Sequence, residues 1–470
     1  MSKTNQNRKA LLLPALILGD HMFYYLCVEL LINDLAETSL GAKYVVPLYG
    51  AISVATAVGF LLFPLFYHFF KTRRRRRLAL YTAWAINLVS LCIIMGTPIP
   101  ILFTTTSLLV TMSAGYIGGY VFYYLAMSPL PKGSYGMFFG VISAIAMAMS
   151  YPANWMIRAL GDYGDLFQTV LLALCISGSA ALLLFGDTQR IPFQTPEERP
   201  VVQKDMRKYL WGTFGIILIL CCLIGIADGV VTSLHAGQIL NVSGIPRLLN
   251  APAMIAAGFL FDYKKGRYLP MATMIMMMVL TIGVFLFNSA DGYNTALGLL
   301  YVCGSVGSIY AVAALTVTAS STNNPCLWAS MGRVGKYIFN GLMAVCGGLL
   351  FGQGFMLTFL IVFVVLMALL FLLFTFQGKL SVDSREPVSQ IRTAHDLSVY
   401  DFTDREKEIL QKILTSEKSI KELAEELFIS ERVLYRHLDS IYKKTGTTSR
   451  MGLVLLYYGN NTSAAQEEQN

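Results

Sequence analysis

The chain has 470 residues, of which 55% are hydrophobic and only 14% are charged, and its mean hydropathy is +0.57. This composition is typical of a membrane protein and excludes an ordinary soluble regulator or soluble enzyme. Lysine and arginine exceed aspartate and glutamate by 36 to 28, which gives a formal net charge of +8. The position of this excess along the chain, more than its size, indicates the orientation in the membrane.

Apolar runs long enough to cross a bilayer as helices recur along the first 377 residues. The first run is too long for the apolar part of a signal peptide and lacks a small-residue cleavage site, so we expect it to remain as a span. The eighth and eleventh runs fit the span length least well. The sequence therefore predicts an all-α membrane domain over 1–377 with about twelve spans, near 11–33, 44–70, 78–97, 101–127, 136–157, 166–186, 210–234, 246–261, 268–288, 295–319, 326–352 and 354–376.

Lysine and arginine are unevenly distributed between the two sides of these spans. Segments assigned to the cytoplasm carry 18 of them, with six in 71–77, whereas segments assigned to the outside carry three. Because cytoplasmic loops are enriched in these residues, we expect a multi-pass protein of the cell inner membrane with both termini in the cytoplasm. The run Arg73 to Arg77 is predicted to anchor this topology beside lipid head groups.

The loops suggest two halves. The longest loop, 187–209, is polar, contains three prolines and divides the spans six and six, as in transporters built from repeats. A later loop reads Gly-Phe-Leu-Phe-Asp-Tyr-Lys-Lys-Gly-Arg over 258–267. It resembles the Gly-x-Leu-x-Asp-Arg-x-Gly-Arg loop of the major facilitator superfamily, with Tyr263 in place of the usual arginine. The resemblance implies a major facilitator-like bundle.

Ionisable side chains inside the predicted spans are energetically costly and mark candidate functional sites. Asp20 and Asp228 occupy comparable depths in the first span of each half, and the resemblance implies that these spans line a central cavity. Two carboxylates there can face the cations of the eleventh span and bind a ligand with them. An internal ion-pair lock that binds no ligand fits the same residues. The candidate ligand-binding residues are Asp20, His21, Asp228, Arg333 and Lys336.

Other polar residues of the spans are weaker candidates. Glu29 and His235 are expected near the aqueous boundary. All eight cysteines lie in or at the ends of apolar runs without metal-ligand spacing, so we expect neither disulfides nor a metal site. The sequence contains no paired catalytic carboxylates in an aqueous domain, no nucleophile motif and no phosphate-binding loop, so neither an enzyme nor a cofactor is expected.

The chain becomes polar after residue 377. Residues 378–396 contain Pro387 and lack apolar periodicity, so we predict a linker. Residues 397–460 are predicted to form a small domain of four helices, and 461–470 a polar tail. Capping residues mark the helix starts: boxes at Thr403 with Glu406 and at Ser419 with Glu422, and single caps at Ser430 and Ser449.

The third of these helices has two different faces. Its inner face carries Val433, Leu434, Leu438 and Ile441, and its outer face is mainly cationic with one aromatic, which suits a helix in the major groove of DNA. Residues 401–459 hold ten basic and ten acidic residues, but the positive charge gathers around this helix. This charge favours DNA binding over an unspecialised helical tail. The predicted DNA-binding residues are Arg432, Tyr435, Arg436, Asp439, Lys443, Lys444 and Arg450.

The same segment resembles the LuxR-type regulator domain, from about Leu397 to Gly459. The shared stretches are Phe-Thr-Asp-Arg-Glu-Lys-Glu-Ile-Leu at 402–410, Ile-Lys-Glu-Leu-Ala-Glu-Glu-Leu-Phe-Ile-Ser-Glu at 420–431 and Ile-Tyr-Lys-Lys-Thr-Gly at 441–446. The resemblance implies that the third helix reads the major groove and the fourth makes a dimer contact, so the expected partners are double-stranded DNA and a second copy of the chain. The family usually has Thr-Val-Lys where this chain has Val433-Leu434-Tyr435, so the operator sequence does not follow.

These expectations combine into a membrane-embedded one-component transcriptional regulator. Its bundle is expected to sense an unknown small-molecule effector, and its C-terminal domain to bind promoter DNA. An alternative is a major facilitator-like transporter whose C-terminal domain controls its own operon. In a third interpretation the bundle is only an anchor. Accumulation of substrate in vesicles separates the first two, and exchange of the bundle for an unrelated span tests the third.

Overall fold

The computed structural model of the protein describes residues 3–380 and 402–447, except positions 98, 129, 131–132, 190–203, 238, 241, 243, 264–267, 287–289, 416–419, 428 and 446. The chain divides into two compact units, Met1–Asp383 and Ser384–Asn470, which we describe separately. We call the helices of the first unit the bundle. The exact limits of the predicted domains and linker stay predictions.

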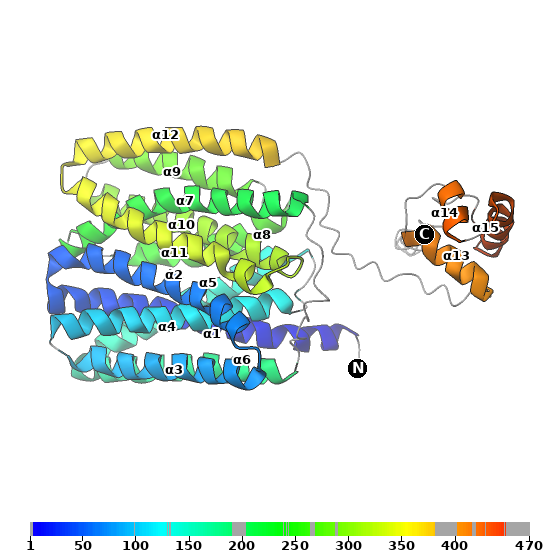
Figure 1. The fold of residues 1–470 in the computed structure, drawn as a ribbon. Helices are drawn as coiled ribbons and strands as arrows, with labels where there is room; N and C mark the ends of the chain where they lie inside the picture. Colours follow the sequence, from blue (N-terminus) through cyan, green and yellow to red (C-terminus); the bar gives the residue numbers. More distant parts are fainter. Residues whose placement is uncertain are drawn as a thin grey trace. The chain divides into compact units, whose positions relative to one another are not determined.

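Twelve helices make up the described part of the bundle, which confirms the all-α prediction (Figure 1). Ten of them are long and apolar enough to cross a membrane; the other two are the shorter α8 and α9. Their bounds are α1 Lys3–Leu40, α2 Val45–Phe69, α3 Arg73–Gly96, α4 Pro100–Met127, α5 Tyr135–Ala159, α6 Gly164–Gln189, α7 Lys204–Ala236, α8 Asn250–Asp262, α9 Leu269–Leu286, α10 Ala290–Ala319, α11 Pro325–Phe351 and α12 Phe355–Leu380.

The helix ends differ from the predicted spans where local geometry intervenes. Helix α8 begins four residues late because Ile245–Leu249, with a proline in its first turn, forms a separate 3-10 helix, η4. Helix α3 begins inside the arginine run, so these cations occupy its first turns. The span near 326–352, which fitted least well by sequence, is the 27-residue helix α11. Helix α12 continues to Leu380, three residues into the predicted linker.

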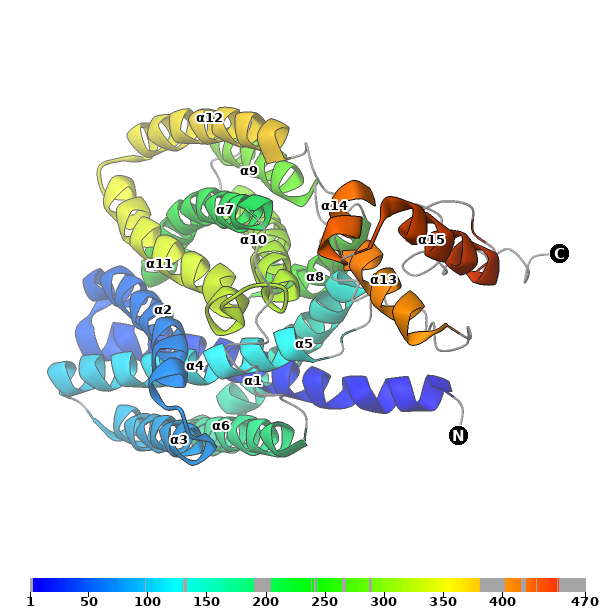
Figure 2. The same cartoon turned by 45° about the vertical axis from the view of Figure 1, so that its right-hand side comes forward.

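The first six and the last six helices meet along two main contacts, α2 with α11 and α5 with α8 (Figures 1 and 2). Glycines allow the second contact. A Cβ atom at Gly136 of α5 would lie 2.3 Å from the Gly258 oxygen of α8, and one at Gly258 would lie 2.5 Å from the Gly136 oxygen. The two backbones therefore approach closely only without side chains at these positions. This arrangement brings the two halves into direct contact.

Asp262, the acidic residue of the major facilitator-like loop, joins the same two helices. Its carboxylate accepts hydrogen bonds from the backbone N–H groups of Gly136, at 2.7 Å, and Met137, at 2.8 Å. These groups belong to the first turn of α5, where N–H groups lack partners within the helix. The acidic residue of this loop therefore caps a helix of the opposite half. Residues 264–267 of the loop lie outside the described residues.

The C-terminal unit contains α13 Asp404–Thr415, α14 Ile420–Glu426 and α15 Glu431–Thr445. The predicted capping box at Thr403 and Glu406 is confirmed, because each side chain accepts a hydrogen bond from the other residue's backbone N–H group. Ser430 caps α15 through the Val433 N–H group. The predicted cap at Ser419 and the fourth helix from Ser449 lie outside the described residues. The core consists of Phe402, Ile409, Leu410, Ile413, Leu423, Ala424, Leu427, Leu434, Leu438 and Ile441.

Candidate nucleic-acid interface and polar cluster of the bundle

Helix α15 has one buried and one exposed face, because apolar residues recur every three to four positions. Leu434, Leu438 and Ile441 are buried among residues of α13 and α14. Val433, which the sequence assigned to the inner face, is only partly buried. The opposite face exposes five of the predicted DNA-binding residues, which are Arg432, Tyr435, Arg436, Asp439 and Lys443. A sixth predicted residue, Lys444, is also exposed, on another side of the helix, and the seventh, Arg450, lies outside the described residues.

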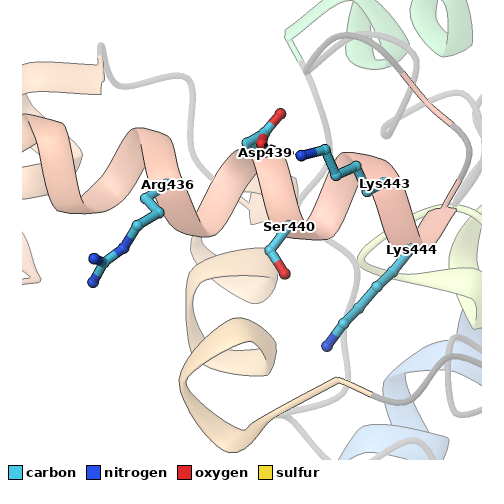
Figure 3. A pocket seen from close by; sticks show the side chains of 5 residues that line it. All are labelled: Arg436, Asp439, Ser440, Lys443 and Lys444. Atoms are coloured by element: carbon cyan, nitrogen blue, oxygen red, sulfur yellow. Dashed lines mark ion pairs between the residues drawn. The ribbon is translucent and has the colours of Figure 1, made fainter.

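A shallow pocket lies on this helix, lined by Arg436, Asp439, Ser440, Lys443 and Lys444 (Figure 3). Figure 3 shows Asp439 and Lys443 side by side, whereas Ser440 and Lys444 project from another side and Arg436 points away from both pairs. The Lys443 Nζ atom lies 2.9 Å from the Asp439 carboxylate. Hydrogen bonding to that carboxylate raises the pKa of Lys443 above its usual value.

Lys444 has a partner that the sequence did not reveal. Its Nζ atom lies 2.7 Å from Glu406 of α13, whose side chain is only 5% exposed. The same carboxylate accepts hydrogen bonds from the Ser440 hydroxyl, at 2.7 Å, and from the Thr403 backbone, at 2.8 Å. The Lys444 ammonium group, followed by the hydroxyl and backbone donors, lowers the pKa of Glu406 to about 2. Lys444 therefore joins α15 to α13, and its predicted contact with DNA stays a prediction.

Arg432, Tyr435 and Arg436 remain unengaged within the described part of the chain. None of the three forms a hydrogen bond or ion pair with a described residue. Tyr435 is 57% exposed despite its aromatic ring. Free guanidinium groups and an exposed ring on one helical face can contact base edges and phosphates without first breaking an internal interaction. This face is the best-formed candidate interface of the C-terminal unit.

The candidate ligand-binding residues of the bundle have different hydrogen-bond partners, although Lys336 interacts electrostatically with both Asp228 and Arg333. Asp20 of α1 accepts a hydrogen bond from the Ser179 hydroxyl of α6, at 2.6 Å. Asp228 of α7 instead accepts one from the Asn340 amide of α11, at 2.8 Å, and that amide also donates to the Tyr49 hydroxyl of α2. Neither carboxylate forms an ion pair with a cation of α11 among the described residues. The arrangement therefore gives no direct ion-pair lock.

The two cations of α11 also have different surroundings. Lys336 donates a hydrogen bond to the Ser308 hydroxyl of α10, at 2.7 Å. Arg333, one turn earlier, points its Nη2 atom at the Met22 sulfur of α1, at 2.7 Å. Both Arg333 and His21 are only 3% exposed, and they interact electrostatically. The bundle thus brings His21 and Arg333 together across α1 and α11.

Glu29 is a central residue that sequence reasoning placed at the aqueous boundary. It is partly buried on α1 and interacts electrostatically with Lys336 first, and then with Arg247 and Arg333. The signal that could have identified it is its spacing, because Glu29 lies two turns of helix after His21 and Met22 and therefore shares a face with them. His235, the other boundary residue, pairs its Nδ1 atom with the Leu240 carbonyl oxygen.

Comparison with known families identifies the C-terminal segment. Residues 401–457 match the family described as "Bacterial regulatory proteins, luxR family". The match includes α13, α14 and α15, and so the helix with the exposed cationic face. No curated protein matches the chain.

Comparison with solved structures identifies the fold of the bundle. The human organic anion transporter MFSD10 (TETRAN) is similar with a TM-score of 0.57 at 13% identity, covering 78% of this chain and 99% of that one. An auto-inhibited POT family peptide transporter is similar with a TM-score of 0.53 at 11% identity, covering 81% and 99%. At these identities the likeness establishes the fold alone. The chain therefore joins a segment that matches the luxR family to a multi-pass membrane bundle that shares the fold of these two transporters.

Proposed function

We propose that this protein is a one-component transcriptional regulator that senses a small molecule through its bundle and binds promoter DNA through α15. The observation that carries the proposal is the exposed face of α15, where Arg432, Tyr435 and Arg436 have no described partner. A regulatory domain in the same chain as a transporter-like bundle lets an effector act on transcription without a second protein. The proposal includes neither an enzymatic activity nor a cofactor.

The DNA partner is double-stranded, and the chain binds it as a homodimer on two half-sites. A single recognition helix contacts few base pairs, so affinity for an operator normally comes from two copies. The bundle lies in the inner membrane with both termini in the cytoplasm, where DNA is available. The cationic start of α3 supports this orientation, because its arginines favour the cytoplasmic side.

We expect the full chain to occupy a discrete set of promoters in cells. Chromatin immunoprecipitation of a tagged full-length protein is expected to enrich those promoters at least tenfold over a variant truncated after Gln377. A chimera in which an unrelated twelve-span bundle replaces residues 1–377, expressed in the same strain, tests the sensing role. Regulation that is lost while occupancy persists supports sensing. Unchanged regulation supports a mere anchor, and absent occupancy contradicts the regulator.

A transporter that controls its own operon is the second candidate, and the transporter fold of the bundle favours it. The two proposals differ in flux across the membrane. A regulator binds its effector at equilibrium, whereas a transporter accumulates it in sealed vesicles when a gradient is applied. Uptake above that of vesicles without the protein would support the second candidate.

The topology makes a separate prediction. A reporter that is active only in the cytoplasm is expected to work when fused after Gln377 or within 187–209, and to fail after Gly161. The physical reason is the concentration of Lys and Arg in the segments assigned to the cytoplasm. A periplasmic reporter at the same three positions is the control and should give the opposite pattern. An external signal after Gln377 would contradict the proposed function, because a DNA-binding domain outside the cell cannot meet DNA.

A further inference from the structure

The guanidinium group of Arg333 lies in the bundle without an adequate acceptor. The residue is 3% exposed, its Nη2 atom contacts the Met22 sulfur, and its Nε atom has no partner among the described residues. A thioether is a weak acceptor, whereas a guanidinium carries five N–H donors. A buried charge of this kind is costly unless an anion or several strong acceptors compensate it. Glu29 interacts electrostatically with Arg333, but no described carboxylate forms an ion pair or a hydrogen bond with its guanidinium group.

Two carboxylates of the bundle, Asp20 and Asp228, have hydrogen-bond partners other than Arg333. Asp20 accepts from Ser179 on the side facing α6, and Asp228 accepts from Asn340. Glu29 interacts more strongly with Lys336 than with Arg333 and forms no ion pair with either among the described residues. None of these carboxylates satisfies the N–H donors of Arg333 directly. The missing acceptor is therefore best supplied from outside the chain.

A row of aromatic rings from three helices begins at this guanidinium group. Its central carbon lies 5.3 Å from the ring centroid of Phe122 on α4, and His21 meets the same ring edge-on at 6.4 Å. Phe60 of α2 links that ring to Tyr337 of α11, with centroid distances of 6.0 Å to Phe122 and 5.8 Å to Tyr337. These side chains are almost fully buried. The surroundings of Arg333 are therefore largely aromatic.

A second unpartnered polar atom lies beside the same ring. His21 Nδ1 is buried and has no partner among the described residues. The other nitrogen of this imidazole faces α4, where a Cβ atom at Gly118 would lie 2.7 Å from His21 Nε2. Two buried groups near Phe122, one of them a cation, thus each have a polar atom without a described partner. Such groups in a protein interior mark the position of a ligand or an unusually strained site.

We propose that the effector is an aromatic carboxylate held by Arg333. The proposal rests on the sensing function proposed above and names its ligand class. The carboxylate accepts hydrogen bonds from the Nε and Nη2 atoms of Arg333, replacing the Met22 sulfur, in the two-pronged geometry that guanidinium groups favour. His21 supplies a further polar contact, and the ring of the effector packs against Phe122, Phe60 and Tyr337.

Direct binding to the purified full-length protein tests the class of ligand. The probes are benzoate, phenylacetate and 1-naphthoate, each paired with its amide, and their affinities are measured by thermal-shift titration. At least one acid is expected to bind at least tenfold more tightly than its amide. Only the acid carries a negative charge that can pair with the Arg333 guanidinium group. If none of the three acids binds better than its amide, the proposal is overturned.

Variants at Arg333 test the site. Arg333→Gln is expected to bind the acid at least tenfold more weakly and to lose the preference over the amide. Arg333→Lys keeps the charge but not the two-pronged geometry, so it should retain part of that preference. Lys43→Gln removes an exposed cation that lies over the Tyr44 ring and is the matched control, with unchanged affinity. Unchanged binding by Arg333→Gln would overturn the assignment.

Photolabelling of the unaltered protein decides the site even if the Arg333 variants fail to fold. Irradiation with 4-azidobenzoate is expected to label peptides from α1, α2, α4 or α11, and excess benzoate should prevent the labelling. A label confined to other helices would overturn the proposal. Promoter occupancy is measured in cells that express the same protein. Occupancy without acid binding refutes only the ligand class, whereas acid binding without occupancy refutes only the regulator.

Discussion

Replacing Glu406 with alanine is expected to lower the free energy of unfolding of the C-terminal unit by about 2 kcal/mol. The carboxylate is almost fully buried and accepts hydrogen bonds from Lys444, Ser440 and Thr403, so it connects α13 to α15. Its loss leaves the Lys444 ammonium group without its buried partner. Small domains have only about 5–15 kcal/mol of stability in total, so this change removes a large part of it.

The measurement is urea unfolding of the fragment 384–470, which contains a separate compact core. Glu408→Ala is the matched control on the same helix. Glu408 pairs with Arg405 at 2.5 Å, but its side chain is 49% exposed, so its loss should change the stability by less than about 1 kcal/mol. Equal effects of the two substitutions would contradict the structural role of Glu406.

The pH dependence gives an independent readout of the same carboxylate. The pKa of Glu406 is lowered from 4.5 to about 2 in the folded unit. The stabilisation is therefore fully present above pH 4.5, where the unfolded chain is also ionised, and is lost as the pH falls through about 2. Glu406→Gln is expected to abolish this part of the acid sensitivity. A stability that falls equally with pH in Glu406→Gln and the unaltered fragment would contradict the prediction.

The C-terminal unit shows what a sequence can reveal about such a network. The capping box at Thr403 and Glu406 follows from two residues at a fixed spacing, because both partners lie in one helical turn. The contacts of Glu406 with Ser440 and Lys444 join positions 34 and 38 residues apart. They depend on how α15 crosses α13, which local patterns do not determine. The sequence therefore predicted Lys444 as a DNA contact only.

The bundle shows the same difference between local patterns, which the sequence reveals, and contacts between distant residues, which it does not. Apolar runs predicted the spans, because each span must satisfy its own backbone hydrogen bonds in the membrane, and the polar loop 187–209 predicted the division into halves. They did not predict partners across helices. Asp20 and Asp228 resemble one another in sequence, yet Ser179 on α6 binds one and Asn340 on α11 binds the other. The neighbours of Arg333 depend on packing over 311 residues of chain, and no spacing rule covers that distance.

Replacing Arg436 with alanine is expected to weaken binding to the preferred operator by about 1–3 kcal/mol and to relax the preference at one base position. Three cations of α15 lie near one another, but they are not equivalent. Lys443 pairs with Asp439 and Lys444 with Glu406, whereas Arg436 has no described partner. Its guanidinium can therefore take the two acceptors of a guanine edge without losing another contact.

Lys443→Ala is the matched control, because Lys443 also lies on the exposed face but its charge is partly compensated by Asp439. A phosphate contact carries no sequence information, so this change should weaken operator and scrambled duplexes alike and reduce the salt slope by about 1. Titrations of the 384–470 fragment, fused to a dimerising coiled coil, against both duplexes at several salt concentrations measure the two effects. The difference between duplexes is the decisive quantity. If Arg436→Ala weakens both equally, Arg436 binds phosphate, and base readout must lie with Arg432, Tyr435 or Asp439.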